Sequence, residues 1–155
     1  MNIRKATFYC VAGLILVGPV VAFVVGRQLA AAGTPTETCD LEFSNGATLY
    51  RVPVAKTAAQ EARGLMHKTD VGPGMLFTWE KPEPRVFWMR NTPAPLTIGF
   101  FDTEGVLFSV EDMEPNSETN HFSFQPAVDA LELAQGEYQR LGLSVGSALV
   151  RRKCR

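Results

Sequence analysis

The stretch FWMRNTPAPLTIGFFDTEGVLFSV, residues 87–110, decides the fold class of this chain. Every second residue of 96–100 is large and apolar, and a period of two is typical of a strand with one buried face. Residues 103–105 (TEG) have the composition of a turn, and the alternation resumes over 106–110. The stretch therefore predicts two strands joined by a short turn.

Further short strands are predicted on both sides of this pair, and Asn45-Gly46 is a strong hairpin signal between two of them. One short helix is expected after Thr57, because Thr57 and Gln60 have the spacing of a capping box and Gly64 is suited to end the helix. The expected strands are 41–43, 47–54, 75–79, 86–90, 96–102, 106–110, 128–133 and 148–152, with a polar loop at 113–125 and one helical turn at 136–141. This pattern predicts a mainly β fold, a compact β-sandwich or partly closed barrel of about seven short strands with one or two short helices.

Residues 8–25 form an uncharged apolar run before the predicted domain. Because a helix crosses a bilayer with about 20 mostly apolar residues, the run is long enough for a transmembrane helix. Arg4 and Lys5 precede the run and favour a cytoplasmic N-terminus with export of the rest of the chain. Two alternatives stay open, a signal peptide cleaved after Ala32 and an uncleaved signal anchor. We therefore expect a signal peptide or signal anchor (1–32), a linker (33–40) and an exported mainly β domain (41–155) in the periplasm or outside the cell.

The positions of the cysteines are consistent with export of the domain. Cys39 and Cys154 lie near the two ends of the exported part, and an oxidising compartment permits a disulfide between them. Domain termini often lie close together, which favours the bridge over two free thiols. We therefore expect a Cys39–Cys154 disulfide.

The composition excludes several classes of protein. The chain has 155 residues, of which 46% are hydrophobic and 20% are charged, so it is untypical of disordered proteins. A formal net charge of −1 disfavours a nucleic-acid binder. Two histidines and three cysteines leave little room for a metal cage. We expect no cofactor and assign no metal ligands.

Four motifs succeed one another in the chain: ARGLM (62–66), GMLFTW (74–79), FWMRNTPAPLTIGFFDTEG (87–105) and PAVDALELAQGEYQRLGLSVG (126–146). In this order and spacing they resemble the domain-of-unknown-function 192 family, also called uncharacterised protein family 0127, over about residues 41–152. The resemblance implies a compact mainly β domain, often behind a signal peptide, and it implies no activity, because none is established for the family. Many members have a tyrosine before the Ser-x-x-Pro-Ala stretch, sometimes with cysteines in the preceding loop, whereas this loop has His121 and no cysteine.

Trp88 and Arg90 are the first candidates for ligand contact. Neighbouring strand residues point to opposite faces, so the residues on either side of Trp88 are expected in the core and these two outside it. An aromatic ring and a cation beside the polar turn Asn91-Thr92 suit a carboxylate, sugar or peptide ligand. The alternative is that Trp88 covers the edge of the sheet and Arg90 pairs with a carboxylate.

Asp102, His121 and Glu132 are candidate ligand contacts, or acids and bases of an enzyme. Asp102 stands in a turn sequence that only partly resembles a calcium loop, and His121 lies in a polar loop without a hydrolase motif. Glu132 is flanked by two leucines in a predicted strand, so we expect a buried carboxylate that pairs with Arg90 or Arg140. If all three lie in one cleft, an enzyme is favoured.

The leading interpretation is an exported, envelope-located binding or accessory module for a small ligand or an envelope protein. The cytoplasmic membrane is a further partner if residues 8–25 stay uncleaved. Two alternatives stay open, a hydrolase-type enzyme acting on envelope substrates and a protein that handles metal, with carboxylates for calcium or methionines for copper. For those methionines, filling of the core is the more frequent use.

Overall fold

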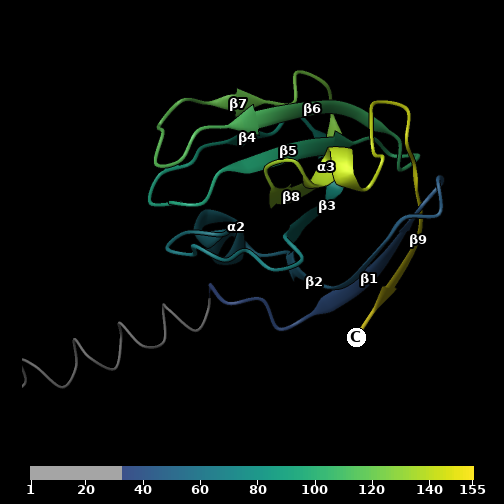
Figure 1. The fold of residues 1–155 in the computed structure, drawn as a ribbon, viewed down its shortest axis with the longest axis horizontal. Helices are drawn as coiled ribbons and strands as arrows, with labels where there is room; N and C mark the ends of the chain where they lie inside the picture. The colour runs from purple at the N-terminus through teal and green to yellow at the C-terminus, as the bar shows by residue number, and fades with distance from the viewer. Residues whose placement is uncertain (1–32) are drawn as a thin grey trace, which may run out of the picture.

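Seven strands form the main sheet of the computed structural model, which describes residues 33–155 (Figure 1). Their order across the sheet is β6-β5-β8-β3-β2-β1-β9, and β4 and β7 form a separate sheet of two strands. The elements along the chain are β1 (Thr38–Phe43), β2 (Thr48–Ala55), α2 (Ala58–Arg63), β3 (Met75–Glu83), β4 (Val86–Phe87), β5 (Leu96–Phe101), β6 (Leu107–Met113), β7 (His121–Phe122), β8 (Ala127–Ala134), α3 (Glu137–Arg140) and β9 (Leu149–Cys154). The predicted signal peptide or anchor, residues 1–32, lies outside the described residues.

The strands of the main sheet pair antiparallel except β2 and β3, which run parallel at Val54–Leu76 and Ala55–Phe77. Parallel neighbours need a crossover connection, and α2 lies in it. Within residues 33–155, no helix has the length and apolar character needed to cross a membrane.

The helix α2 begins as predicted. The Thr57 hydroxyl accepts a hydrogen bond from the Gln60 N–H (3.3 Å), and the Gln60 side chain accepts one from the Thr57 N–H (3.2 Å), so the capping box is complete. Gly64 comes directly after the last turn with φ +45°, in the region where a side chain is unfavourable. Local sequence chemistry therefore determines both ends of this helix.

The main sheet curls into a half-barrel. Its two edge strands approach each other at one end, where Val106 and Ala148 form a bridge and the Leu107 N–H donates to the Ser147 carbonyl at 2.8 Å. Figure 1 shows β1 and β9 curving away from β5 and β6. Of the two predicted architectures, the partly closed barrel is found as this half-barrel, and the sandwich was wrong.

Both faces of the central strands β3, β5 and β8 are buried, because alternate residues enter two separate cores. The core inside the curl joins the central strands to β1, β2 and α3. The other core lies on the outer face, beneath the segments that come after α2 and β4. Its members are Ala55, Leu65, Val71, Met75, Phe77, Met89, Ala94, Leu96, Ile98, Phe100, Met113, Ala127 and Ala130.

The predicted disulfide is present. Cys39 on β1 stands directly opposite Cys154 on β9, and the sulfur atoms are bonded. Cys39 is buried in the inner core, whereas Cys154 is exposed. The bridge therefore joins the first and last strands of the described chain at one edge of the sheet.

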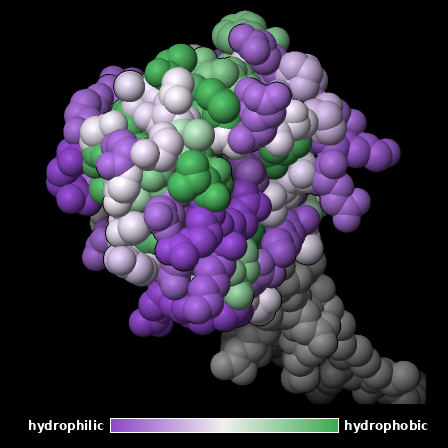
Figure 2. All heavy atoms as spheres, turned by 90° about the vertical axis from the view of Figure 1, so that its right-hand side faces the viewer, coloured by the Kyte–Doolittle hydropathy of each residue, from purple (hydrophilic) through white to green (hydrophobic). Residues whose placement is uncertain are grey.

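Charged side chains protect the edge strand β9. Arg151 pairs with Glu42, and Arg155 pairs with Asp40 at 2.9 Å, so both arginines contact carboxylates of β1. On the face of the molecule that Figure 2 shows, hydrophilic residues gather in the lower half and hydrophobic residues lie mainly in the upper half. Charges along an edge strand hinder its pairing with a second chain.

Most predicted boundaries differ from the observed ones by a few residues, and β1 begins at Thr38, inside the expected linker 33–40. Three differences have an identifiable cause or partner. The expected strand 86–90 has only two strand residues, because Asn91 adopts a left-handed φ of +55° and the chain turns before the next strand. β3 extends to Glu83 through a predicted loop, with an irregularity in its register where Pro82 lacks a donor. The expected loop 113–125 contains β7, which pairs with β4.

Candidate functional site

A cleft of about 400 Å³ lies on the outer face of the sheet, between α2, β3 and β4. One side of α2 faces it, through residues spaced three and four apart. The residues lining the cleft are Ala58, Glu61, Ala62, Arg63, Gly64, Leu65, Met66, Phe77, Trp79, Pro84, Arg85, Val86, Phe87, Trp88, Thr92 and Glu132. A volume of this size holds a small organic molecule.

Glu132 supplies the buried carboxyl of this cleft. It stands in the middle of β8, opposite Met75 of β3 and Ile98 of β5, and only 4% of the residue is exposed. No hydrogen bond or ion pair joins its side chain to any of residues 33–155. The expected pairing with Arg90 or Arg140 was wrong, because Arg90 pairs with Glu118 (3.0 Å) and Arg140 pairs with Glu137 (2.6 Å).

The backbone around Glu132 is tightly packed. Gly74 lies against it with φ +84°, and a Cβ atom at Gly74 would come within 2.1 Å of the Glu132 carbonyl oxygen. Only glycine fits this position, because both the backbone conformation and the close approach exclude a side chain. Glu132 is therefore held on a rigid part of the sheet.

Burial raises the pKa of Glu132 from 4.5 to about 8. The cause is loss of hydration, because the charged form has no partner to replace the water it loses. The carboxyl is therefore mainly protonated at neutral pH. A neutral acid of this kind can donate a hydrogen bond, or it can give up its proton when a cation binds beside it.

Aromatic rings form the walls of the cleft. Phe87 packs edge to face on Phe77, with 4.9 Å between ring centroids, and on Trp79 at 6.2 Å. Trp88 stands at the mouth and is 46% exposed. Rings in contact with one another leave faces and edges for an apolar ligand or for a cation.

Three charged residues complete the lining, Glu61 and Arg63 from α2 and Arg85 just before β4. The Arg85 guanidinium lies 4.2 Å from the centroid of the Trp79 ring and donates to the Lys81 carbonyl oxygen at 2.5 Å. It also lies 3.5 Å from Glu83. Arg85 is therefore committed to contacts within the protein.

Trp88, Thr92 and Glu132 are the sequence-predicted candidates that the structure brings together in the cleft. Arg90 lies outside it, and its guanidinium is 5.0 Å from the centroid of the Trp88 ring, so the predicted pairing of an aromatic ring with a cation is present. Asn91 also lies outside, where its carbonyl accepts a hydrogen bond from the His67 N–H at 2.7 Å. Of the four candidates within residues 88–92, only Trp88 and Thr92 therefore line the cleft.

Asp102 and His121 do not line the cleft. The Asp102 carboxylate accepts hydrogen bonds from the N–H groups of Glu104 and Val106, both at 2.9 Å, and so holds the turn after β5. His121 is buried in β7, with its Nδ1 atom 2.8 Å from the Glu111 carboxylate in an orientation unsuited to a hydrogen bond. The three residues considered for an enzyme therefore do not share one cleft.

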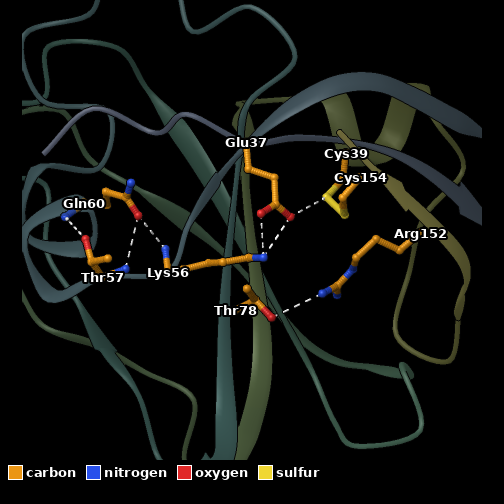
Figure 3. A network of polar contacts seen from close by, with 8 residues as sticks. All are labelled: Glu37, Cys39, Lys56, Thr57, Gln60, Thr78, Arg152 and Cys154. Carbon is orange, nitrogen blue, oxygen red and sulfur yellow. Dashed lines mark hydrogen bonds and ion pairs between the residues drawn. A yellow bond between two sulfur atoms is a disulfide. The ribbon is translucent and has the colours of Figure 1, made fainter. Parts of the chain in front are cut away.

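A polar network lies beside the disulfide (Figure 3). Lys56 Nζ is 2.7 Å from one Glu37 oxygen, and Arg152 donates to the Thr78 hydroxyl at 3.2 Å. These side chains line a second cleft, of about 540 Å³. Lys56 already pairs with Glu37, and Arg152 pairs with Asp129, so the charged groups of this cleft are less available to a ligand than Glu132 in the first cleft.

The described residues contain one group of metal-ligand type, Glu37 with Cys39 and Cys154. Its two sulfur atoms are joined in the disulfide and are not thiolate ligands. The methionines considered for copper are divided between two places, with Met75, Met89 and Met113 in the outer core and Met66 in the lining of the cleft.

The residues that the sequence interpretation missed come from three separate segments. They are one face of α2, the aromatic rings of Phe77 and Trp79 on β3, and the cation Arg85 with the neighbouring ring of Phe87. The spacing of Ala58, Glu61 and Ala62 marks one face of a helix, and this face was the available signal. No local pattern indicates that this face lies opposite β4.

The fold and the cleft define a small mainly β domain with a ligand-sized hollow on the outer face of its sheet. A family model named DUF192, described as "Uncharacterized ACR, COG1430", matches residues 41–150. The chain belongs to this uncharacterised family. No curated protein matches the chain.

Two solved structures are similar to this chain. A protein of unknown function from Novosphingobium aromaticivorans DSM 12444 is 30% identical with a TM-score of 0.66, and the match covers 75% of this chain and 83% of that one. A protein from Sinorhizobium meliloti 1021, described as a candidate transcription regulator, is 31% identical with a TM-score of 0.67. That match covers 78% of this chain and 95% of the other. Both likenesses support the fold.

Replacing Glu132 with glutamine is expected to remove a pH dependence of stability. Glu132 keeps its proton to about pH 8 in the folded chain, whereas its ordinary pKa is 4.5. Between these values the folded state binds more protons than the unfolded state. The free energy of unfolding of the wild type therefore falls as pH rises, by about 1.4 kcal/mol per pH unit.

Urea unfolding of the wild type and Glu132→Gln at several pH values between about 5 and about 8 measures this difference. As the pH rises across this range, the free energy of unfolding of the variant is expected to increase steadily relative to that of the wild type. Two curves that stay parallel would show that Glu132 has an ordinary pKa.

Proposed function

We propose that this chain is a small-molecule-binding domain and that the cleft at Glu132 is its ligand site. The observation that carries the proposal is a single buried carboxyl, without a protein partner among residues 33–155, in a cleft with aromatic walls. A few polar groups in a mainly apolar hollow are typical of ligand sites. The neutral carboxyl and the rigid backbone around Glu132 suit recognition of one polar group in an otherwise apolar ligand.

The residues that line the cleft fit a binding function better than a hydrolase activity. Besides Glu132, the described residues that line the cleft offer the Thr92 hydroxyl and the charges of Glu61, Arg63 and Arg85. Hydrolases of the acid–base or nucleophile type use paired groups in hydrogen-bond reach of each other. The geometry favours binding because Glu132 stands without such a partner among residues 33–155.

We further propose that the domain acts outside the cytoplasm, in the cell envelope. The Cys39–Cys154 disulfide supports this location, because such bonds persist in oxidising compartments. The apolar run at 8–25 supports it as well, since a basic start and an apolar stretch are typical of export signals. The domain is then either released after cleavage or held at the cytoplasmic membrane by this run.

The replacement Ala62→Phe is expected to abolish ligand binding in the cleft. Ala62 is an exposed residue of α2 that lines the cleft, so a phenyl ring there occupies ligand volume without entering the core. The probe is 2-phenylethanol, which has an aromatic ring and one polar group. Titration followed by amide chemical shifts in NMR measures its affinity. The variant is expected to bind at least about tenfold more weakly than the wild type.

Ala59→Phe is the matched control, because Ala59 is also exposed on α2 and does not line the cleft. It is expected to leave the affinity unchanged. Binding of 2-phenylethanol that survives Ala62→Phe would contradict the proposal, and so would failure of both 2-phenylethanol and 2-phenylethylammonium to bind the wild type at millimolar concentration.

A further inference from the structure

We infer that the ligand carries an organic ammonium group, which binds beside the carboxyl of Glu132. The inference rests on the proposed function and adds the chemical class of the ligand. It is carried by the groups that face Glu132, by the rings around the cleft and by the poor fit of other ligand classes.

The groups that face Glu132 leave its negative charge without compensation. Met75 and Ile98 flank it on the neighbouring strands, and both are apolar and buried. Tyr138 interacts electrostatically with Glu132 but makes no hydrogen bond to it, because the Tyr138 hydroxyl donates to the Leu131 carbonyl at 2.8 Å. The pKa of Tyr138 is raised well above the ordinary value by burial, so this hydroxyl stays neutral.

The cations that line the cleft do not pair with Glu132. Arg85 is held by Trp79, Lys81 and Glu83, and Arg63 shares the lining with the opposite charge of Glu61. Within residues 33–155, no ion pair joins either arginine to Glu132. A cationic group brought in by a ligand would therefore give the buried carboxyl the partner that this part of the chain does not supply.

The aromatic walls favour the same ligand. The faces of tryptophan, tyrosine and phenylalanine rings attract ammonium groups, most strongly where water is excluded. Phe77, Trp79, Phe87 and Trp88 all line the cleft that contains Glu132. A carboxylate and several aromatic rings together are a suitable environment for an organic cation.

Other charged ligands fit less well. A hard metal ion takes six or more oxygen ligands, and the described lining of the cleft provides two carboxyl groups, of which Glu61 belongs to α2. An anion could accept a hydrogen bond from the neutral Glu132 carboxyl, but it would meet the negative faces of the aromatic rings that form the walls of the cleft. An ammonium group attached to an apolar body uses the carboxyl and the rings at once.

Binding of the cation moves a proton. Before binding, Glu132 is a neutral acid at neutral pH. When the ammonium group binds, the carboxyl O–H bond breaks, the proton goes to solvent, and the carboxylate pairs with the cation. The affinity for a cation should therefore rise about tenfold per pH unit below the pKa of Glu132 and level off above it.

The test compares 2-phenylethylammonium with 2-phenylethanol, two probes of nearly equal shape that differ in charge. Isothermal titration calorimetry in buffers of different ionisation enthalpy measures both affinity and proton release. At about pH 8 the wild type is expected to bind the ammonium probe at least about tenfold more tightly than the alcohol. Between about pH 7 and about pH 6 the affinity for the ammonium probe should fall about tenfold, and that for the alcohol should not.

Glu132→Gln removes the charge with little change of shape, and Glu104→Gln, at an exposed position outside the cleft, is its control. The first replacement should lower the affinity for the ammonium probe at least about tenfold and end its pH dependence. The second should leave both unchanged. The pH series and the proton release are properties of the wild type, so they decide the question even if Glu132→Gln fails to fold.

The outcomes separate the two proposals. Equal affinity of the wild type for both probes, without proton release, overturns the inference about the ammonium group and leaves the binding cleft in place. A preference for the ammonium probe that Glu132→Gln retains also overturns it. Failure of both probes to bind overturns the proposed function itself.

Discussion

Replacing both Cys39 and Cys154 with alanine is expected to lower the free energy of unfolding by about 4–5 kcal/mol. The disulfide closes a loop with a sequence separation of 115, and a bridge across so long a loop removes much of the conformational freedom of the unfolded chain. The folded state also loses the covalent contact that holds β9 against β1. Equilibrium urea unfolding of the wild type and the double variant measures the change.

A reductant provides the control for this prediction. It should lower the unfolding midpoint of the wild type to near that of the double variant and leave the variant unchanged. A double variant within about 1 kcal/mol of the wild type would show that the unfolded chain is restrained by something other than the bridge.

Replacing Arg152 with methionine is expected to cost about 3 kcal/mol at neutral pH. Arg152 reaches from β9 to Thr78 on β3 and Asp129 on β8, so it connects an edge strand with two central strands. The Asp129 side chain is only 9% exposed, and its Oδ1 atom has no hydrogen-bond partner within residues 33–155. Methionine keeps most of the volume of arginine and leaves this carboxylate buried without a cation.

The pH dependence of this loss has a definite sign. Burial raises the pKa of Asp129, and the charge of Arg152 opposes that rise. Without Arg152 the pKa of Asp129 rises further, so the variant loses most stability where Asp129 must stay charged. The difference between wild type and variant should therefore shrink as the pH is lowered and Asp129 takes up a proton.

Arg151→Met is the matched control. Arg151 is the neighbouring arginine of β9, and it pairs with Glu42 at an exposed position. Exposed ion pairs contribute little, so this variant should unfold close to the wild type. Asp129→Leu combined with Arg152→Met removes both charges and should recover much of the lost stability. Equal losses in Arg151→Met and Arg152→Met would contradict the special role of the buried pair.

The sequence predicts those parts of the fold that depend on neighbours along the chain. The strand pair expected at 96–102 and 106–110 and the capped helix after Thr57 were predicted from alternation and from capping chemistry, and the structure confirms both. The parallel pairing of β2 with β3 and the pairing of β4 with β7 were not expected. Each joins segments far apart in sequence, and no local pattern specifies which distant strand becomes a neighbour.

The same division applies to the candidate site. Glu132 was identifiable because a carboxylate between two leucines in a strand is unusual, and its burial is a consequence of the strand pattern. Its surroundings depend on how three distant segments come together on the outer face of the sheet. The expected partners Arg90 and Arg140 pair instead with Glu118 and Glu137, so Glu132 has no partner among residues 33–155. Local preferences do not reveal which of several possible ion pairs forms.

The pairing of β1 with β9 has a consequence for the order of folding. The ribosome makes β1 first among the described strands and β9 last, so one edge of β1 stays open until β9 has been made. Contacts between residues this far apart form slowly, because a long loop must close before they are gained. The half-barrel therefore cannot complete its sheet or its covalent bridge before β9 has been made. Of the described strands, the one made last is the one that completes the domain.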